Sequence, residues 1–187
     1  MTPFKSDWTA LACYPTTLTD AVRGINVCVL RDPSGVLTVR YVLYAATLHV
    51  RVPPTQAPAR TDGLWKHTCF EAFIAPVAAD GGYYELNFSP SSQWAIYSFE
   101  AYRKGMSPTQ VTAPPRLAVR RFDDRLEMAA TIDLADLKGL REVRTLKLAV
   151  TAVVEDDSGT LSYWALKHAP GKPDFHHQDG FVLELPQ

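Results

Sequence analysis

The fold is indicated most clearly by the stretch Arg60-Thr-Asp62-Gly63-Leu-Trp65-Lys-His67-Thr-Cys69-Phe-Glu71-Ala-Phe73, which is followed by Tyr84-Glu85-Leu-Asn87-Phe-Ser89-Pro90. Aromatic residues recur here, and polar residues alternate with apolar ones, as in short buried or half-buried strands. The pattern predicts strands over residues 68–74, 83–88 and 94–99. Because alternate side chains of a strand share a face, we expect Glu71 to lie beside Cys69 and Phe73, and Glu85 beside Asn87.

The same pattern extends to both sides of this stretch. Short runs rich in Val, Thr, Tyr and Phe are separated by Pro, Gly, Asp and Ser, which is typical of an all-β domain. Asp133 is a suitable N-cap for the single short helix that we predict over residues 133–140. The expected fold is one domain, residues 1–187, built as a two-sheet antiparallel β-sandwich. Further strands are expected over residues 25–30, 36–45, 47–52, 117–122, 126–132, 146–155, 161–168 and 181–185.

Composition narrows the classes of function. The chain has 187 residues and a formal net charge of −1, without a basic run, which argues against a nucleic-acid partner. No apolar stretch is long enough to cross a bilayer, and residues 1–8 lack the apolar segment of a signal peptide, so we predict a cytoplasmic protein without a membrane partner. Cys13, Cys28 and Cys69 form no Cys-x-x-Cys pair, which favours reduced thiols, with a Cys13–Cys28 bridge as the alternative.

Three motifs have a counterpart in a known family. They are Asp62-Gly-Leu-Trp65 with Thr68-Cys-Phe-Glu71-Ala-Phe73, then Tyr84-Glu-Leu-Asn-Phe-Ser-Pro90, and then Tyr163-Trp-Ala-Leu-Lys-His168 with Lys172-Pro-Asp-Phe-His176. From about Gly24 to the C-terminus, the chain resembles the DOMON-like domains, which are related to the family-nine carbohydrate-binding modules. This resemblance implies a β-sandwich, and relatives of this type bind sugars or haem. The bacterial branch that the chain resembles most has no assigned activity.

The residue types on these strands suit a polar ligand with a flat side. A sugar presents C–H groups on one side and hydroxyls around its rim, so an aromatic plate and polar side chains can bind it together. The leading hypothesis is non-catalytic binding of a saccharide or a sugar-bearing metabolite. Since a mid-strand asparagine conflicts with β propensity, we expect Asn87→Ala to weaken binding without unfolding the domain. The predicted ligand-binding residues are Trp65, Glu71, Glu85, Asn87, Trp94, Arg103, Trp164 and His168.

Two other classes of function fit the same sequence. Glu71 and Glu85 could form the acid–base pair of a small glycan-acting hydrolase or isomerase. Alternatively, the loop over residues 169–180 could be the contact of a protein-interaction domain. That loop could also simply be held on the sandwich by hydrogen bonds of Asp174 or His176. Exposed sheet edges are compatible with a homodimer.

Cofactors are weaker alternatives, and none is predicted. His168 and the segment over residues 174–177 contain the residue types of a divalent-metal site, but adjacent side chains of an extended loop point apart. Haem would need an axial ligand such as Met106 or Met128. Met128 alternates with apolar strand residues, which favours core packing instead.

Overall fold

The computed structural model of the protein describes residues 8–77 and 81–187. Strands dominate these residues, and only short 3₁₀ turns accompany them. The turns lie at Pro15–Thr17, Thr47–His49, Leu64–Lys66, Leu134–Asp136 and Gln178–Gly180. The strands are β1 (Thr9–Cys13), β2 (Val22–Arg31), β3 (Val36–Ala45), β4 (Cys69–Pro76), β5 (Tyr83–Phe88), β6 (Trp94–Phe99), β7 (Ser107–Pro108), β8 (Arg116–Arg121), β9 (Arg125–Asp133), β10 (Thr145–Glu155), β11 (Leu161–Ala165) and β12 (Leu183–Pro186).

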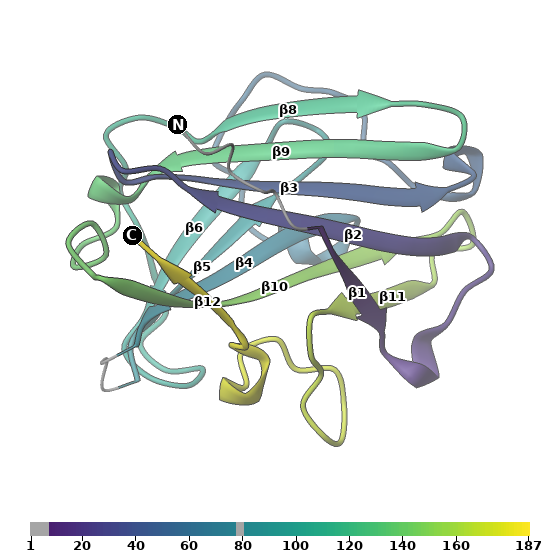
Figure 1. Ribbon diagram of the computed structural model, residues 1–187. Coiled ribbons are helices and arrows are strands. Elements are labelled where there is room, and N and C mark those ends of the chain that lie inside the picture. The colour runs from purple at the N-terminus through teal and green to yellow at the C-terminus, as the bar shows by residue number, and fades with distance from the viewer. Residues whose placement is uncertain (1–7, 78–80) are drawn as a thin grey trace.

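The strands form two antiparallel layers. Sheet A has the order β1-β2-β3-β9-β8, and sheet B has the order β7-β6-β5-β4-β10-β11, with β12 also paired to β10. Strand β1 pairs with β2 of sheet A and, through Ala12 and Cys13, with β11 of sheet B, so one curled surface connects the layers. In Figure 1 strands β8, β9, β3 and β2 of sheet A cross the upper half of the view, while β4, β5 and β6 slant below them in another direction. The predicted two-sheet antiparallel sandwich is confirmed.

The core lies between the inner faces of the sheets. One register row of inner side chains crosses sheet B, and it consists of Trp94, Phe88, Phe70, Ala152 and Trp164. Tyr41 of sheet A packs on Phe70, with ring centres 4.8 Å apart, and its hydroxyl donates to the Glu71 carbonyl at 2.8 Å. The buried tyrosine oxygen is therefore satisfied, and its bond joins the two sheets directly behind the Glu71 side chain.

The outer faces of the two sheets differ. In β3 and β9 of sheet A, buried positions alternate with more exposed ones, as expected for a sheet with one solvated face. In β4 of sheet B six consecutive residues are buried, so both of its faces are covered. A second apolar cluster, which includes Phe73, Tyr83 and Phe99, lies on the outer face of sheet B, and Phe175 and Phe181 of the C-terminal segment pack against it. Sheet B therefore has a second, locally covered surface on which a site can be built.

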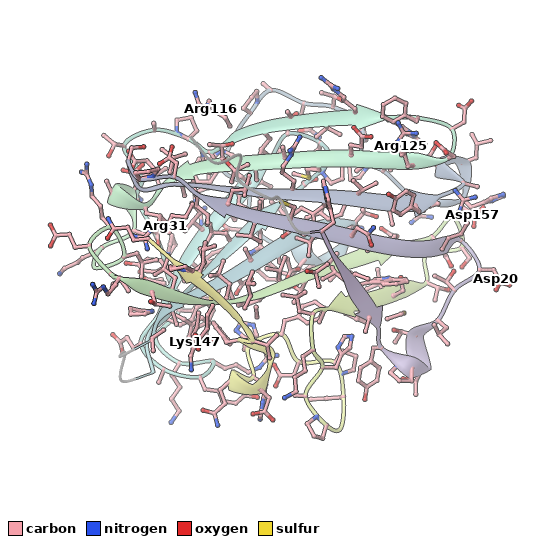
Figure 2. All side chains as sticks on the ribbon, viewed as in Figure 1. Asp20, Arg31, Arg116, Arg125, Lys147 and Asp157 are labelled. Carbon is pink, nitrogen blue, oxygen red and sulfur yellow. The ribbon has the colours of Figure 1, made fainter. Side chains whose placement is uncertain are left out.

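Charged side chains are mostly peripheral. Those of Asp20, Arg116, Arg125 and Asp157 lie on the outside of the molecule (Figure 2). Arg31 is buried, and its guanidinium donates to the carbonyls of Val143 and Arg141, both at 2.8 Å. Within the described ranges, no helix combines the length and the apolar character needed to span a membrane.

Several local predictions need correction. The helix expected over residues 133–140 is only the 3₁₀ turn Leu134–Asp136, although Asp133 does cap it by accepting from the Ala135 amide at 2.8 Å. No strand covers residues 47–52, because Thr47–His49 is another 3₁₀ turn. Strand β11 ends at Ala165, and the strands β1 and β7 were not predicted.

Two further expectations concern the termini and the cysteines. Cys13 is a reduced thiol, so the alternative of a Cys13–Cys28 bridge is wrong. The prediction about a signal peptide rests largely on residues 1–7, and these lie outside the described residues.

Candidate functional site

The outer face of sheet B carries two carboxylates on neighbouring strands. One register row contains Ala95, Asn87, Glu71 and Thr151, and the next contains Tyr97, Glu85, Phe73 and Ala149. Glu71 on β4 and Glu85 on β5 are thus diagonal neighbours, a relation that places α-carbons about 7–8 Å apart. The strand alternation that the sequence predicts for Glu71 and Phe73, and for Glu85 and Asn87, is confirmed.

A cavity of about 360 Å³ lies above these rows. Four polar or charged residues line it, namely Glu71, Glu85, Arg103 and His176. Most of the remaining wall is aromatic or apolar and consists of Trp65, Phe73, Phe99, Met106, Val153, Tyr163, Pro173 and Phe175. An apolar wall with a few convergent polar groups is the usual composition of a small-molecule site. We refer to this space as the carboxylate cavity.

The motif Asp62-Gly63-Leu64-Trp65 places Trp65 at the edge of this cavity. Gly63 has a φ of +75°, which favours glycine, and begins the 3₁₀ turn Leu64–Lys66. Leu64 is buried in the outer-face cluster, while the Asp62 carboxylate accepts from Arg60 at 2.7 Å and from the Tyr97 hydroxyl. The half-buried Trp65 ring then meets Tyr97 edge-on, with ring centres 5.8 Å apart. The indole is therefore held in place before any ligand binds.

Glu71 is the most unusual side chain of the cavity. It is only 2% exposed, and its Oε1 atom has no hydrogen-bond partner among the described residues. Thr151, which lies opposite in register, likewise makes no hydroxyl bond of normal geometry within the described chain. Burial raises the pKa of Glu71 well above its usual range, the charge of Glu85 raises it further, and the neighbouring Thr151 hydroxyl lowers it. A buried, incompletely paired carboxyl is costly to the fold, and such groups are characteristic of functional sites.

Glu85 is oriented by a residue beneath the cavity. Its Oε1 atom accepts from the Asn87 side-chain amide at 2.8 Å, and Asn87 itself is fully buried. Burial raises the pKa of Glu85, whereas the Asn87 hydrogen bond and the charge of Arg103 lower it. Asn87 therefore acts on the site by positioning Glu85, although it does not line the cavity.

The C-terminal loop closes one side of the cavity. Asp174 accepts from Arg103 at 2.7 Å and from the Tyr102 hydroxyl, while His176 Nδ1 lies 2.8 Å from the Tyr83 hydroxyl. Phe175 contacts Phe73, with ring centres 6.5 Å apart. The predicted attachment of this loop through Asp174 and His176 is confirmed. Much of the loop thus packs on the sandwich, so less of its surface is open to a partner protein, as the protein-interaction hypothesis would need.

His176 is a neutral neighbour of Glu85 at ordinary pH. Burial lowers the pKa of His176 to about 4, and the charge of Arg103 lowers it further, while Asp174 acts in the opposite direction. Its Nε2 atom lies 3.8 Å from Glu85 Oε2, beyond normal hydrogen-bond distance. The imidazole therefore does not neutralise the Glu85 carboxylate near pH 7.

The structure brings together only part of the predicted set. Trp65, Glu71, Glu85 and Arg103 line the carboxylate cavity, and Asn87 lies directly beneath it. Trp94 and Trp164 are each 6% exposed and belong to the inner-face row, on the opposite side of the sheet. His168 is half-buried, with its Nε2 atom 2.8 Å from the Ala12 carbonyl. The candidate site therefore omits Trp94, Trp164 and His168, because none of them lines this cavity.

Three aromatic residues that line the cavity were not among the predicted site residues. In β11 and β6, Tyr163 and Phe99 lie on the face opposite to Trp164 and Trp94. Knowing that the two tryptophans face inward would therefore have identified Tyr163 and Phe99 as outer-face residues. Phe175 lies in a loop and has no comparable periodic signal. Of the two methionines considered as haem ligands, Met106 lines the cavity, while Met128 is 2% exposed in the inner core. No cluster of three or more His, Cys, Asp or Glu side chains suited to a metal ion occurs among the described residues.

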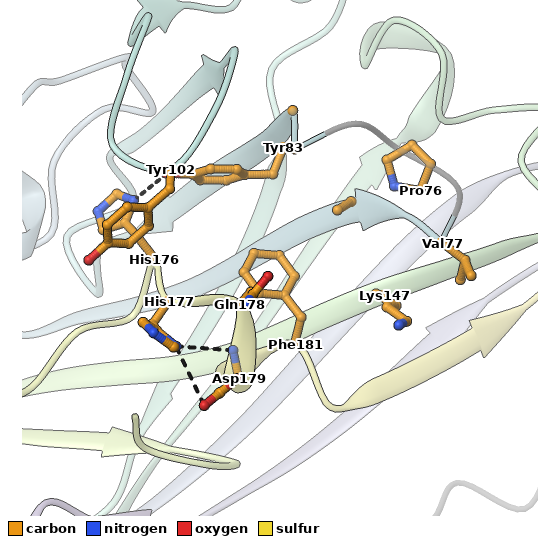
Figure 3. A pocket seen from close by; sticks show the side chains of 13 residues that line it. Pro76, Val77, Tyr83, Tyr102, Lys147, His176, His177, Gln178, Asp179 and Phe181 are labelled. Carbon is orange, nitrogen blue, oxygen red and sulfur yellow. Dashed lines mark hydrogen bonds and ion pairs between the residues drawn. The ribbon is translucent and has the colours of Figure 1, made fainter. Parts of the chain in front are cut away.

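A second cavity, of about 660 Å³, adjoins the first and shares His176 with it (Figure 3). Its ionisable groups include His177, Asp179 and Lys147. His177 and Asp179 contact one another, with a separation of 3.8 Å between Nδ1 and Oδ2. This cavity contains no buried carboxylate among its described lining, so we place the candidate site in the smaller carboxylate cavity.

Similar folds occur among solved structures, although no known family model and no curated protein sequence matches the chain. A provisionally assigned carbohydrate-binding protein from Bacteroides uniformis superposes with a TM-score of 0.70 at 15% identity, covering 94% of this chain and 84% of that one. A family 9 carbohydrate-binding module from Caldicellulosiruptor kristjanssonii, in complex with cellotriose, gives 0.52 at 12% identity, with coverages of 89% and 75%. Its complex with glucose gives 0.51 at 12% identity, with coverages of 89% and 76%. The chain shares the fold of these proteins.

The buried Glu71 carboxyl predicts an unusual pH dependence of stability. The pKa of Glu71 is higher in the folded chain than in the unfolded chain. At a pH below the unfolded-state value, the protonated carboxyl therefore contributes fully to stability, and this contribution is lost as the pH rises through the folded-state value. Relative to the wild type, Glu71→Gln should therefore become more stable with rising pH, by at most about 1.4 kcal/mol per unit. Urea unfolding from pH 5 to pH 8 measures this difference. The exposed Glu142→Gln is the control and should show none, and a Glu71→Gln difference that is constant with pH would contradict the assignment.

Proposed function

We propose that this domain binds a saccharide in the carboxylate cavity without catalysing a reaction. The observation that carries the proposal is the buried Glu71 carboxyl, with an unpaired oxygen, at a cavity whose wall is mostly aromatic. Carboxylates can accept from the hydroxyls of a sugar, and aromatic rings can cover its C–H face. The names of the structurally similar proteins, which refer to carbohydrate binding, cellotriose and glucose, support the same class of ligand.

The relationship to DOMON-like domains belongs to this proposal as well. It rests on the motifs around Trp65, Asn87 and Tyr163, and the positions of these residues support it. Trp65 and Tyr163 line the carboxylate cavity, and Asn87 orients Glu85 from below. Residues of all three motifs thus lie at or next to the carboxylate cavity.

Trp65 provides the test of the proposal. Trp65→Ala should weaken saccharide binding about tenfold or more, since tryptophan contacts are among the strongest single contributions at binding sites. Isothermal titration against a panel of mono- and oligosaccharides measures the effect. Trp8→Ala is the matched control, because Trp8 is 43% exposed and does not line the cavity, and it should bind as the wild type does. Equal affinities in Trp65→Ala and the wild type would place the ligand elsewhere, and a panel without any binding would refute the function.

A glycan-acting hydrolase or isomerase is the second candidate. The observation in its favour is that Glu71 and Glu85 are diagonal neighbours in one cavity, where one protonated and one ionised carboxyl could serve as acid and base. Turnover of glycosides that disappears in both Glu71→Gln and Glu85→Gln would establish it. Binding of the same glycosides without turnover would favour the binding module.

A further inference from the structure

The carboxylate cavity contains more negative than positive groups. Glu71 and Glu85 are 2% and 5% exposed, so water solvates neither carboxyl well. Taking carboxylates out of water is unfavourable unless they are paired or protonated. Glu85 receives a neutral amide donor from Asn87. Glu71 has only the neutral Thr151 hydroxyl nearby, and its Oε1 atom receives no hydrogen bond of normal geometry from the described residues. The fold thus provides too few donors for two ionised carboxylates.

The neighbouring basic groups do not make up this deficit. Arg103 lines the cavity, but its guanidinium is paired with Asp174 at 2.7 Å, and its side chain is half exposed, so solvent screens it. His176 is neutral near pH 7 for the reasons given above. The other groups around the two carboxyls are the phenols of Tyr41, Tyr83, Tyr97 and Tyr163, the Cys69 thiol and the Thr151 hydroxyl, none of which carries positive charge.

The walls of the cavity suit a positively charged ligand. Trp65, Phe73, Phe99, Tyr163 and Phe175 present aromatic rings to the same space. The faces of such rings attract cations, and aromatic surroundings together with a carboxylate are a recurrent way to bind an ammonium group. These walls would equally cover the C–H face of a sugar ring, so one ligand with both features would use the whole cavity.

We infer that the ligand of this cavity is a sugar with a free amine, whose ammonium group binds between Glu71 and Glu85. This inference rests on the proposed function and narrows its ligand class. The ammonium would supply the donors that Glu71 lacks and would add a positive charge beside both carboxylates. A neutral sugar, in contrast, would add no positive charge beside the two carboxyls.

A proton linkage follows from this inference. With no ligand, burial raises the pKa values of both Glu71 and Glu85, which favours the protonated form of each carboxyl. An ammonium ion lowers those pKa values and displaces the proton, so binding should release protons to the buffer and tighten as the pH rises, until the amine itself loses its charge. A sugar without an amine should release none.

Calorimetric titration with three matched sugars tests the inference. Glucosamine, glucose and N-acetylglucosamine share a ring, and only glucosamine carries an ammonium group. We expect glucosamine to bind about tenfold to a hundredfold more tightly than the other two, as a charged hydrogen bond predicts. Repeating the titration at pH 6, 7 and 8, in two buffers with different ionisation enthalpies, measures proton release. Glu71→Gln should abolish both the preference and the proton release, whereas the exposed Glu142→Gln should change neither.

The outcomes separate this inference from the proposed function. Glucose or N-acetylglucosamine binding as tightly as glucosamine would overturn the amine inference and leave saccharide binding intact. If ethanolamine, which has no sugar ring, bound as tightly as glucosamine, the cation site would stand and the saccharide function would fall. Glucosamine binding that is unchanged in a folded Glu71→Gln variant would place the amine elsewhere and overturn the inference.

Discussion

Asn87→Asp should be among the most destabilising single substitutions in the domain, lowering the free energy of unfolding at pH 7 by about 3–5 kcal/mol. Asn87 is fully buried, and its amide donates to Glu85 at 2.8 Å. The substitution replaces that donor with a third carboxyl beside Glu71 and Glu85, where no described cation can neutralise it. For a domain of this size the melting temperature should fall by roughly 10 °C.

The pH dependence separates charge from packing in this prediction. At low pH the new carboxyl is protonated and can donate to Glu85, so the loss of stability measured by urea unfolding should be smaller at pH 4.5 than at pH 8. Asn26→Asp, on the half-buried strand position Asn26 of β2, is the matched control and should change stability little. A loss that is equal at both pH values would show that packing, and not the carboxyl cluster, sets the role of Asn87. The same burial revises the expectation for Asn87→Ala, which should now reduce stability as well as binding.

Trp94→Ala should lower the free energy of unfolding by about 3–5 kcal/mol, as expected for removal of a large aromatic side chain from a core. Trp94 is 6% exposed, and it lies beside Phe88 in the inner-face row, so its loss opens a cavity between the sheets. Differential scanning calorimetry measures the effect, with a fall in melting temperature of roughly 10 °C expected.

Conservative variants distinguish this structural role from ligand contact. Trp94→Phe keeps most of the packing and removes an indole N–H that has no partner among the described residues, so it should remain folded and bind saccharide as the wild type does. Trp65→Ala should show the reverse behaviour, with near-normal stability and weak binding. Loss of binding in a stable Trp94→Phe variant would contradict the placement of Trp94 in the core.

Much of the fold could be predicted because it depends on local patterns. Strands β5 and β6 were predicted with their observed bounds, since alternation and turn residues specify a strand without knowledge of its partners. The helix prediction failed because Asp133 caps a 3₁₀ turn as readily as an α-helix, and the sequence after it has too few helical turns to decide. Strand β1 was missed because its short run, Thr9–Cys13, is only weakly periodic.

The site was predictable within a strand but not between strands. Alternation correctly grouped Glu71 with Phe73 and Glu85 with Asn87, yet it does not say which face of β6 or β11 joins them. Both faces of sheet B carry aromatic residues, so the large indoles of Trp94 and Trp164 looked as suitable as Tyr97 and Tyr163. Only the register, which places Trp94 beside Phe88 and Glu85 beside Tyr97, assigns the faces. The loop residues Phe175 and His176 reach the site through tertiary packing that no local pattern encodes.

The burial of Glu71 and Glu85 with few hydrogen-bond donors is unfavourable for the fold. Buried carboxyls that lack partners reduce stability. Apolar residues of similar size at the same outer-face positions would not carry this cost. Such a cost to stability is typical of functional sites.

If a saccharide binds on the outer face of sheet B, the four tryptophan indole N–H signals in a ¹H–¹⁵N spectrum should report where it binds. Trp65 lines the carboxylate cavity, Trp94 and Trp164 lie in the inner core, and Trp8 is exposed away from the cavity lining. During titration with a binding saccharide, we expect the Trp65 signal to shift the most and the Trp8 signal to stay in place. A titration in which Trp94, Trp164 or Trp8 shifts while Trp65 remains unchanged would contradict it.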